Sequence, residues 1–470
     1  MLKERCGVIG VYDSTGNPVS VRIGEGLYSL QHRGQEACGI YAHNGRGIEG
    51  HKSPGMVSQV FDAESLAKIA GRAGIGHVLY PTTSVNMAED AQPFLFRSGE
   101  TQFAFSFNGT ITNFIEVMER LKREGESFAG ETDTEVFARL FARKIMRGGD
   151  YFSAFEECFQ ELDGAYCIVL LSKEGDLYGA RDPLGFRPLC FGEIPEGTTV
   201  IASESVAIET LGGRLERDID PGEVIKISKD GIESRHLLSL KRHALCMFEY
   251  VYFARPDSTI QGKNVYETRV RLGRNLAKIH PADIDIVIPV PDSGRSAAFG
   301  YADELGRPTG EGLIKNRYIG RTFIQPGQSA REYSVKLKLN PVRQVVQDKK
   351  IALIDDSIVR GTTMRRTVKL LKAAGAREVH VRPSCPPIIA PCYMGIDFPT
   401  RKELIASGRT VEEIARFIEA DSLGYQSIEG LVSSIGLGNC ELCLACLTED
   451  YPLRKKIDLK LLEATLSRRR

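Results

Sequence analysis

The sequence predicts two halves of different fold class: an α+β layered half, then an α/β half with a parallel sheet. Up to about residue 235, short β-type runs such as TTVIASES, EVIKISKDGIES and the hairpin-like YCIVLLSKEGDLYGARDP are separated by Gly, Pro, Asn and Asp. After about residue 260, apolar runs alternate with helical patterns, which indicates parallel strands joined by crossover helices. The chain of 470 residues is long enough for at least two domains.

Individual elements follow from local patterns. A helix is predicted in ETDTEVFARLFARKIM, where Thr132 and Glu135 have capping-box spacing and Val136, Leu140 and Ile145 can share one face. In the second half, IDIVIPV, KIALID and EVHVRP are predicted strands, and GTTMRRTVKLLKAAG is a predicted helix. The segment SLKRHALCMFEYVYFARPDS is expected to join the two halves.

Composition excludes several classes of function. The chain has 61 basic and 61 acidic residues, so no net charge directs it to nucleic acid or to an anionic membrane. No stretch approaches 18 apolar residues, and the five residues before Cys6 are too short and polar for a secretory signal. We therefore expect a soluble cytoplasmic protein that acts on small molecules.

The most informative run is KIALIDDSIVRGTTMRRTV, a strand followed by two carboxylates, a hydroxyl-rich loop and a helix. The N-terminus of a helix presents free amides, so the loop from Ser357 to Thr363 can bind a phosphate. Gly361 allows the backbone to approach closely. Asp355 and Asp356 suit sugar hydroxyls or a hydrated Mg²⁺. The alternative on local propensity is a strand that ends in a capping turn.

Eleven cysteines, an odd number, do not suggest a disulfide framework. GNCELCLACLTEDYP contains two overlapping C-x2-C pairs, which can bring two thiolates to one metal centre. Cys246, Cys385 and Cys392 are candidates for the remaining ligands. From this chemistry alone, Zn²⁺, an iron-sulfur cluster and a redox pair all stay open.

Together these motifs resemble one family, the glutamine phosphoribosylpyrophosphate amidotransferases, over nearly the entire chain. The second half contributes the run after residue 350, PVPDSGRSAAFGYA and GLIKNRYIGRTFIQPGQSAREYSVKLKLNPVR. The first half contributes CGVIG, SLQHRGQEACGI, the run from Gly76 to Thr82, FNGTITN, GETDTEVF, DGAYCIVLL, RDPLGFRP and ASES. The resemblance implies an N-terminal Ntn-hydrolase (αββα) glutaminase domain at 6–235 and a type I phosphoribosyltransferase domain at 236–470.

For the glutaminase half, the resemblance implies removal of residues 1–5, which makes Cys6 the N-terminal residue. Its free α-amino group then acts as the general base. Asn108 and Gly109 would form the oxyanion hole, and Asp133 would bind the glutamine α-amino group. Arg33 would order the site, and Tyr80 belongs to the matched motif.

For the transferase half, the resemblance implies binding of 5-phosphoribosyl-1-pyrophosphate (PRPP). Asp355 and Asp356 would hold the ribose hydroxyls and Mg²⁺, with Ser293 as a further metal contact. Arg331, Lys336 and Lys338 would lie in a loop that closes over pyrophosphate. The 5-phosphate would be held by Ser357, Ile358, Val359, Arg360, Gly361, Thr362 and Thr363.

One branch of the family carries a [4Fe-4S] cluster, which the resemblance places on Cys246, Cys392, Cys443 and Cys446. Cys440 and Cys385 would then be spare, although Cys440 could replace Cys446. The resemblance also implies feedback inhibition by purine nucleotides and a homotetramer. The expected activity opens purine synthesis: Cys6 hydrolyses glutamine, and the ammonia displaces pyrophosphate from PRPP to give phosphoribosylamine and glutamate.

Two positions depart from the family pattern. Leu79 replaces the Arg that would pair with the glutamine α-carboxylate, and Phe107 replaces the His of the HNG motif. Arg72 is near Leu79 in sequence. One alternative is therefore a phosphoribosyltransferase that works chiefly with free ammonia. A second is a non-catalytic PRPP or redox sensor, which the intact acid pair and both loops argue against.

Overall fold

The computed structural model describes residues 6–80, 90–130, 132–316, 339–398, 400–455, 459, 462 and 463. The expected leader at 1–5 lies outside the described residues, and so does the segment that carries Arg331, Lys336 and Lys338. Among the described helices, none has the length and apolar composition required to cross a membrane.

The first half contains two antiparallel sheets. The seven-stranded sheet has the order β11-β9-β10-β1-β4-β2-β3. Its strands, in sheet order, are Arg214–Asp218, Cys190–Ile194, Thr198–Ala202, Gly7–Asp13, Ala73–Leu79, Ala37–His43 and Ile48–Pro54. The six-stranded sheet has the order β13-β12-β8-β7-β6-β5. Its strands, in sheet order, are Gly231–His236, Glu223–Ser228, Leu177–Arg181, Gly164–Ser172, Thr101–Ile111 and Phe94–Ser98.

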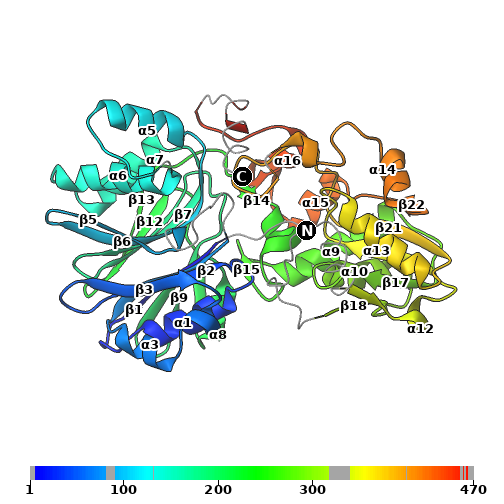
Figure 1. Cartoon of the computed structure of the whole chain (residues 1–470), viewed down its shortest axis with the longest axis horizontal. Coiled ribbons are helices and arrows are strands. Elements are labelled where there is room, and N and C mark those ends of the chain that lie inside the picture. The colour runs from blue at the N-terminus through cyan, green and yellow to red at the C-terminus, as the bar shows by residue number, and fades with distance from the viewer. Residues whose placement is uncertain are drawn as a thin grey trace.

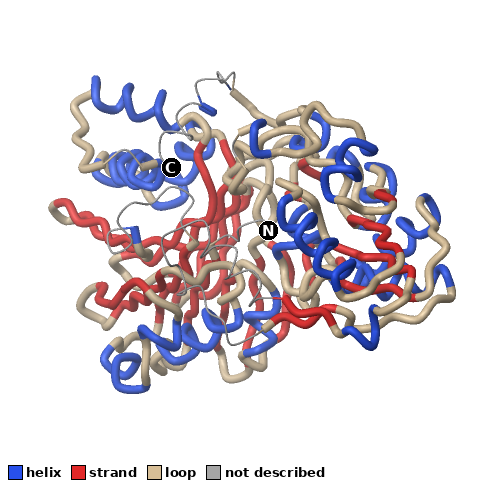
Figure 2. The backbone as a smooth tube through the Cα atoms, turned by 45° about the vertical axis from the view of Figure 1, so that its right-hand side comes forward, coloured by secondary structure: helices blue, strands red, loops and turns tan. Residues whose placement is uncertain are grey.

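The two sheets stack between two layers of helices (Figures 1 and 2). Val8, Ala104 and Val169 belong to the apolar core between the sheets. The outer face of the first sheet packs on α1 (Ser20–Ser29), with α3 (Ala63–Lys68) and α8 (Ser205–Thr210) on the same side. The outer face of the second packs on α5 (Phe114–Arg123), α6 (Asp133–Met146) and α7 (Tyr151–Glu161). These four layers form the predicted αββα arrangement.

The predicted helix after residue 132 is α6, and its cap differs in part from the expectation. The Thr132 side chain accepts a hydrogen bond from Glu135 N at 3.2 Å, as predicted. The Glu135 carboxylate instead accepts from Ala129 N and Gly130 N at 2.7 and 2.8 Å. The reciprocal half of the capping box is therefore absent, because Glu135 closes the preceding turn.

The second half is built on a parallel sheet, β17-β20-β21-β22, with strands Ile286–Pro289, Lys350–Asp355, Glu378–Pro383 and Ser422–Leu423. Helices α9 (Val265–Ile279) and α10 (Arg295–Leu305) pack on the face that carries Val287 and Ala352. Helices α13 (Thr362–Ala373) and α14 (Val411–Ile418) pack on the opposite face, with Ile351 and Leu353. The predicted alternation of strands and crossover helices is confirmed.

Short elements complete the chain. A π-helix, Glu249–Phe253, follows β14 (Leu245–Cys246), and β14 pairs in parallel with β23 (Leu442–Cys443). Two further short pairs are β15 (Thr259–Ile260) with β16 (Lys263–Asn264), and β18 (Leu313–Lys315) with β19 (Leu339–Pro341). The remaining helices are α2 (Val57–Val60), α12 (Arg343–Val346), α15 (Ile428–Ile435) and α16 (Ala445–Thr448), with 3-10 turns at Arg401–Glu403 and Asn439–Glu441. The segment predicted to join the two halves contains β14 and the π-helix.

Candidate functional site

Cys6 lies at the start of β1, on the face that looks toward the second sheet. The register pairs Gly7 with Val78 and Val8 with His77, so Cys6 continues opposite Leu79. Side chains across an antiparallel pair share a face. The Cys6 Sγ is 3.9 Å from Tyr80 O, and burial raises the pKa of the thiol to about 11. At neutral pH the thiol is therefore protonated and needs a base to become a nucleophile.

Asn108 and Gly109 lie on β6, directly across the inter-sheet space. Asn108 is 1% exposed, and its Nδ2 has no acceptor among the described residues. A buried amide without a partner is costly unless a ligand supplies the acceptor. Gly109 has φ of +153°, and a Cβ there would lie 1.9 Å from Ala165 O, so only glycine fits. The pair has the properties expected of an oxyanion hole.

The backbone just before Asn108 is fixed by two side chains that the motif analysis did not single out. Gln92 accepts from Phe107 N at 2.7 Å and donates to Phe107 O at 3.2 Å. His77 Nε2 is also 3.2 Å from Phe107 O, and burial lowers the pKa of His77 to about 3. His77 is therefore neutral and donates this hydrogen bond, so it positions the backbone before Asn108. Its low pKa makes it a weak base.

Phe107 itself points away from Cys6. The centre of its ring lies 6.2 Å from that of Phe137 and 6.0 Å from that of Tyr166, in the aromatic core beneath the outer helices. Because side chains alternate along a strand, Asn108 takes the inter-sheet face and Phe107 takes the helix face. The departure from the HNG motif therefore changes the core and leaves the oxyanion side untouched.

Asp133 is held close to the oxyanion region. Its carboxylate accepts from Ile111 N and Thr134 N, both at 3.0 Å. Its charge acts on Cys6 and tends to raise the pKa of the thiol, although burial is the larger cause. A half-buried carboxylate that is close enough to act electrostatically on the nucleophile suits a substrate ammonium group.

Leu79 offers an apolar surface where the family pattern has a cation. It is 6% exposed and packs with Ala37 and Ala91, and Cys6 packs against the same group. Arg72 cannot replace the missing Arg, because it precedes β4 while Leu79 ends it. The two residues are seven strand positions apart, which is about 23 Å at roughly 3.3 Å per residue. The Arg72 guanidinium instead lies 5.7 Å from the centre of the Tyr12 ring.

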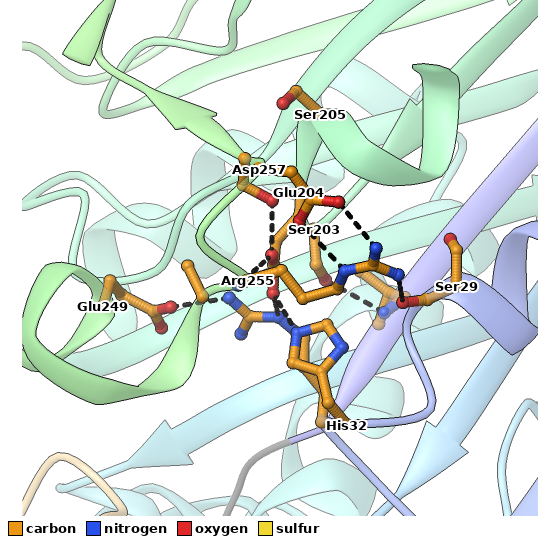
Figure 3. Close-up of polar contacts among 12 residues, drawn as sticks. Ser29, His32, Ser203, Glu204, Ser205, Glu249, Arg255 and Asp257 are labelled. Carbon is orange, nitrogen blue, oxygen red and sulfur yellow. Dashed lines mark hydrogen bonds and ion pairs between the residues drawn. The ribbon is translucent and has the colours of Figure 1, made fainter. Parts of the chain in front are cut away.

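Arg33 is buried in a charged network between the two halves. It is 1% exposed, and its guanidinium pairs with Glu204 and, at 2.6 Å, with Glu249 of the π-helix. Figure 3 shows Glu204 at the centre of this network, close to His32 and Arg255. Burial opposes ionisation of Glu204, but Arg33 and His32 outweigh it and keep the pKa of Glu204 below its usual range. The sequence motifs did not identify either Glu204 or Glu249 as a site residue.

The same network fastens the second half to the first. Glu204 accepts from Arg255 N at 2.9 Å and from Ser258 Oγ at 2.6 Å. Arg187, which is also fully buried, donates to Met394 O at 2.5 Å and lies 3.6 Å from Glu249. The loop after β8 is thereby tied to the segment that carries Cys392.

Asp355 and Asp356 lie at the carboxyl end of β20, where ligands gather in open α/β sheets. Burial and the neighbouring charge of Asp356 raise the pKa of Asp355 well above its usual value. Asp356 accepts a hydrogen bond from the hydroxyl of Ser357. Among the described residues these two adjacent carboxylates form no ion pair, so the site suits a cation.

The loop with Ser293 reaches the same edge. Val290 N donates to Ile354 O at 2.8 Å, and a Cβ on Gly294 would lie 2.4 Å from that oxygen. The glycine therefore allows the loop to pack directly on the end of β20. A cavity of about 510 Å³ opens beside it, lined by Asp292, Arg295, Glu311, Ile314, Lys315, Asn316 and Asn340.

In the phosphate loop, backbone and side chains have different tasks. Ile358 and Val359 are buried, so they can offer a ligand only their backbone amides. Gly361 has φ of +72° and begins α13, and the side chains of Thr362 and Thr363 are exposed. Arg360 pairs with Glu403. The loop can thus offer a phosphate the backbone amides at the N-terminus of α13 and the hydroxyls of Thr362 and Thr363.

Four cysteines gather where β14 meets β23. Cys246 and Cys443 are paired in the register. Burial raises the pKa of Cys446, and the nearby Cys443, Cys392 and Cys246 raise it further. Cys385 is buried next to them, whereas Cys440 is exposed.

The four thiols do not form a preformed zinc site. Among the described residues, the one trio of acidic, His or Cys side chains with ligand atoms all within 4.8 Å of one another is Asp220, Glu223 and His236. No three cysteine sulfurs are therefore that close together, whereas sulfurs around a single zinc ion lie about 3.8 Å apart, from a Zn–S bond of about 2.3 Å.

Comparison with known proteins agrees with both halves. The chain matches a glutamine amidotransferase domain over residues 81–210 and a phosphoribosyl transferase domain over 263–384. The amidophosphoribosyltransferase of Methanocaldococcus jannaschii is 47% identical over 463 residues, which cover 95% of this chain and 97% of the relative. That of Bacillus subtilis is 43% identical over 458 residues, which cover 96% and 94%.

Two solved structures are similar over nearly the full length. One is glutamine PRPP amidotransferase from B. subtilis complexed with ADP and GMP, with a TM-score of 0.89 and 43% identity over 96% of this chain and 98% of that one. The other is described as the allosteric regulatory enzyme of purine biosynthesis, with a TM-score of 0.91 and 42% identity over 98% of each chain.

Fold and matches together define a two-domain enzyme, in which an Ntn-type glutamine amidotransferase precedes a phosphoribosyltransferase. The predicted fold class is thereby confirmed. The chain belongs to the amidophosphoribosyltransferase family. Its activity is that of this family, the first step of purine biosynthesis.

Proposed function

We propose that Cys6, exposed as the N-terminal residue by removal of residues 1–5, hydrolyses glutamine through a glutamyl thioester. Its Sγ attacks the side-chain amide carbon, ammonia leaves with a proton, and water then releases glutamate from the thioester. The observation that carries this half is the buried, unpartnered Nδ2 of Asn108, which faces the same inter-sheet space as Cys6.

The N-terminal amine is the proposed base. A free α-amino group titrates near 7.7 to 8.0, so a part of it is unprotonated at neutral pH. The amine can take the thiol proton as Sγ attacks the amide carbon, and it can then return that proton to the leaving ammonia. His77 is a much weaker base, because burial lowers its pKa to about 3.

Other residues of the first site bind and position. Asn108 Nδ2 and the Gly109 amide stabilise the tetrahedral oxygen, and Asp133 accepts the glutamine ammonium. Arg33 acts by positioning, because its guanidinium is held by Glu204 and Glu249. Tyr80 contributes its carbonyl next to Sγ.

In the second site, ammonia displaces pyrophosphate from C1 of PRPP with inversion, which gives 5-phosphoribosylamine. Asp355 and Asp356 hold the ribose hydroxyls and Mg²⁺, with Ser293 as a further contact. When bound, the metal neutralises charge on the leaving pyrophosphate. The 5-phosphate is held by Ser357 to Thr363. Lys336 and Lys338, which lie outside the described residues, are proposed to bind the pyrophosphate.

We also propose a [4Fe-4S] cluster on Cys246, Cys392, Cys443 and Cys446, which would tie β14 to the C-terminal segment and serve a structural purpose. Two observations support it: Cys246, Cys443 and Cys446 are buried beside the half-buried Cys392, and Arg187 lies near enough to lower the pKa of Cys392 against the larger effect of burial. Electron paramagnetic resonance of the anaerobically reduced protein tests it, since a zinc protein gives no signal.

Further features are proposed from the family alone. The proposed domain boundaries are 6–235 and 236–470; the last strand of the first half, β13 (Gly231–His236), ends one residue beyond this division. The B. subtilis structure with ADP and GMP supports feedback inhibition by purine nucleotides. We also propose that the protein is a homotetramer in the cytoplasm.

One specific observation favours a second candidate, an enzyme that works chiefly with free ammonia. Leu79 and its apolar neighbours provide no charge for the glutamine α-carboxylate. Measuring PRPP-dependent glutamate release beside ammonia-supported turnover separates the two. Saturable glutamine use with a KM below about 1 mM, within the ordinary enzyme range, supports the lead proposal. Turnover with ammonia but no glutamate release supports the second.

A further inference from the structure

The glutamine site needs a cation that its most direct position does not supply. A substrate carboxylate left unpaired in a buried site is strongly disfavoured. The α-carboxylate of glutamine is four carbon–carbon bonds, of about 1.5 Å each, from the carbon that Cys6 attacks. It therefore reaches the group formed by Leu79, Ala37 and Ala91, which packs against Cys6 and is wholly apolar.

Two cations act electrostatically on this part of the inter-sheet space. Arg33 affects Cys6, but its guanidinium is already paired with the buried carboxylates of Glu204 and Glu249. Lys52 affects His77. The charge of Arg33 is thus balanced, although its Nη1 has no acceptor among the described residues. Lys52 is the candidate for which no ion pair with a carboxylate is found among the described residues, and it lies in the same sheet as Leu79.

The sheet register places Lys52 on the correct face. It lies on the edge strand β3, and Gly39 of β2 is paired with both Lys52 and His77. Paired residues in antiparallel strands share a face, so Lys52 points into the inter-sheet space with His77, Leu79 and Cys6. Gly39 between them has no side chain, and the Gln92–Pro93 backbone packs above it, since a Cβ there would lie 2.4 Å from Gln92 O and 2.6 Å from the Lys52 Cβ.

The Lys52 side chain also extends toward the apolar group. Its Nζ donates to Ala91 O at 2.5 Å and lies 4.8 Å from the centre of the Phe94 ring. Ala91 packs on Leu79 and Cys6. Burial lowers the pKa of Lys52, and the charge of Asp90 opposes that effect. The ammonium is thus held beside the group that the substrate carboxylate must approach, with donor capacity beyond the Ala91 carbonyl.

We infer that the Lys52 ammonium binds the glutamine α-carboxylate, and that Lys52 is therefore the residue that makes this site prefer glutamine over amides without a carboxylate. The inference rests on the proposed hydrolysis of glutamine at Cys6. It resolves the difficulty raised by Leu79, since the charge comes from β3 rather than from β4.

The test compares L-glutamine with L-glutaminamide, in which the α-carboxylate is replaced by a neutral amide. The full-length protein is assayed for ammonia-producing hydrolysis of each, and ammonia-supported turnover of the same preparation counts the folded enzyme. In Lys52→Gln, the ratio of kcat/KM for glutamine to that for glutaminamide should fall about 30-fold, as expected when one partner of a buried charge pair is removed. Lys68→Gln, an exposed lysine of the same domain, is the control and should keep the wild-type ratio.

Two more variants keep the inference testable if Lys52→Gln folds poorly. Lys52→Arg keeps the charge and should keep most of the preference. In the Lys52→Gln chain, Leu79→Arg should restore it by supplying a cation from β4. The inference is overturned if the ratio of kcat/KM for glutamine to that for glutaminamide stays at the wild-type value in Lys52→Gln. It is also overturned if the double variant Lys52→Gln, Leu79→Arg does not regain the preference for glutamine. Failure of the underlying proposal looks different: Cys6→Ala would then still hydrolyse glutamine.

Discussion

The two reaction centres differ in how their charges are balanced before substrate arrives. Around Cys6 the thiol is protonated, His77 is neutral, and Arg33 is paired with two carboxylates, so Asp133 and Lys52 are left to meet the two charges of glutamine. At the end of β20, burial raises the pKa of Asp355, and the neighbouring charge of Asp356 raises it further. The first centre thus holds groups of both signs before substrate arrives, whereas the second holds two carboxylates and needs a cation.

This difference shows how one chain divides two kinds of chemistry. Acyl transfer needs donors fixed in advance where an oxyanion will form, and a rigid space between two sheets provides them. Phosphoribosyl transfer handles a highly charged substrate, which can itself bring the compensating metal. The predictions below either break this contrast or measure its size.

The largest effect is expected from Cys6→Ala. Glutamine-supported turnover should fall by about 10⁴-fold or more, because the nucleophile is lost. Ammonia-supported turnover reports the second centre and should persist. Cys440→Ala, which removes an exposed thiol, is the matched control. Glutamate release that survives in Cys6→Ala would contradict the assignment of the nucleophile.

Asp355→Asn should impair the phosphoribosyltransferase centre at the end of β20. Turnover with either nitrogen source should fall by about 10³-fold, since the metal and ribose contact stabilises developing charge by several kcal/mol. Steady-state rates with glutamine and with ammonium chloride, each across a Mg²⁺ series, measure it. Asp348→Asn, at an exposed loop position of the same domain, should behave as wild type. A loss restricted to glutamine would place Asp355 in the wrong centre.

Asn108→Ala removes one oxyanion donor and should lower kcat with glutamine by about 10²-fold to 10³-fold. The KM for glutamine should change little, because the interaction forms mainly in the transition state. Separate determination of kcat and KM distinguishes this from a binding role. A rise in KM with kcat unchanged would show that Asn108 binds the ground state instead.

Glu249→Gln tests the network that joins the two centres. The change leaves Arg33 and Arg187 buried with one carboxylate fewer, and losses of this kind cost about 3–5 kcal/mol. Tm, followed by calorimetry, should fall by roughly 5–10 °C. Asp303→Asn breaks the exposed pair with Arg274 and should shift Tm by about 1–2 °C at most. Equal shifts for the two variants would mean that the buried network adds nothing.

The smallest expected effect concerns acid sensitivity at His77. Its pKa is about 3 in the folded protein because of burial, against about 6.5 in an unfolded chain. Between these values the unfolded chain binds a proton that the folded protein does not, so stability is lost as pH falls below about 6.5. His77→Gln should therefore lose a few degrees less of Tm between pH 7 and pH 5 than wild type. An identical pH dependence in both proteins would refute this account of His77.

Local sequence patterns were sufficient for several elements. The hairpin at 164–181, helix α6 and the strand–loop–helix after residue 350 all lie where their patterns predict them. These features depend on alternation, capping and glycine, which act over a few residues. The capping box was predicted only in part, because Glu135 can accept hydrogen bonds from more than one set of nearby backbone amides. The local pattern does not determine that it binds the amides of Ala129 and Gly130.

Contacts between distant segments could not be predicted in this way. Glu204 and Glu249 lie 171 and 216 residues from Arg33, so no spacing rule connects them. The register also decided questions left open by the motifs. It directs Phe107 to the outer core, separates Arg72 from Leu79 by the length of β4, and places Lys52 on the same face of the sheet as His77.

The central claim is that Cys6 is an N-terminal nucleophile that attacks a glutamine side chain. The most direct test is the intact mass of the purified full-length gene product, before and after treatment with a chloroketone analogue of glutamine, followed by peptide mapping. We predict a chain that begins at Cys6 and gains one adduct, located on the Cys6 sulfur, with loss of glutamine-supported turnover. A chain that keeps residues 1–5, or an adduct on another cysteine with the same loss, would contradict it.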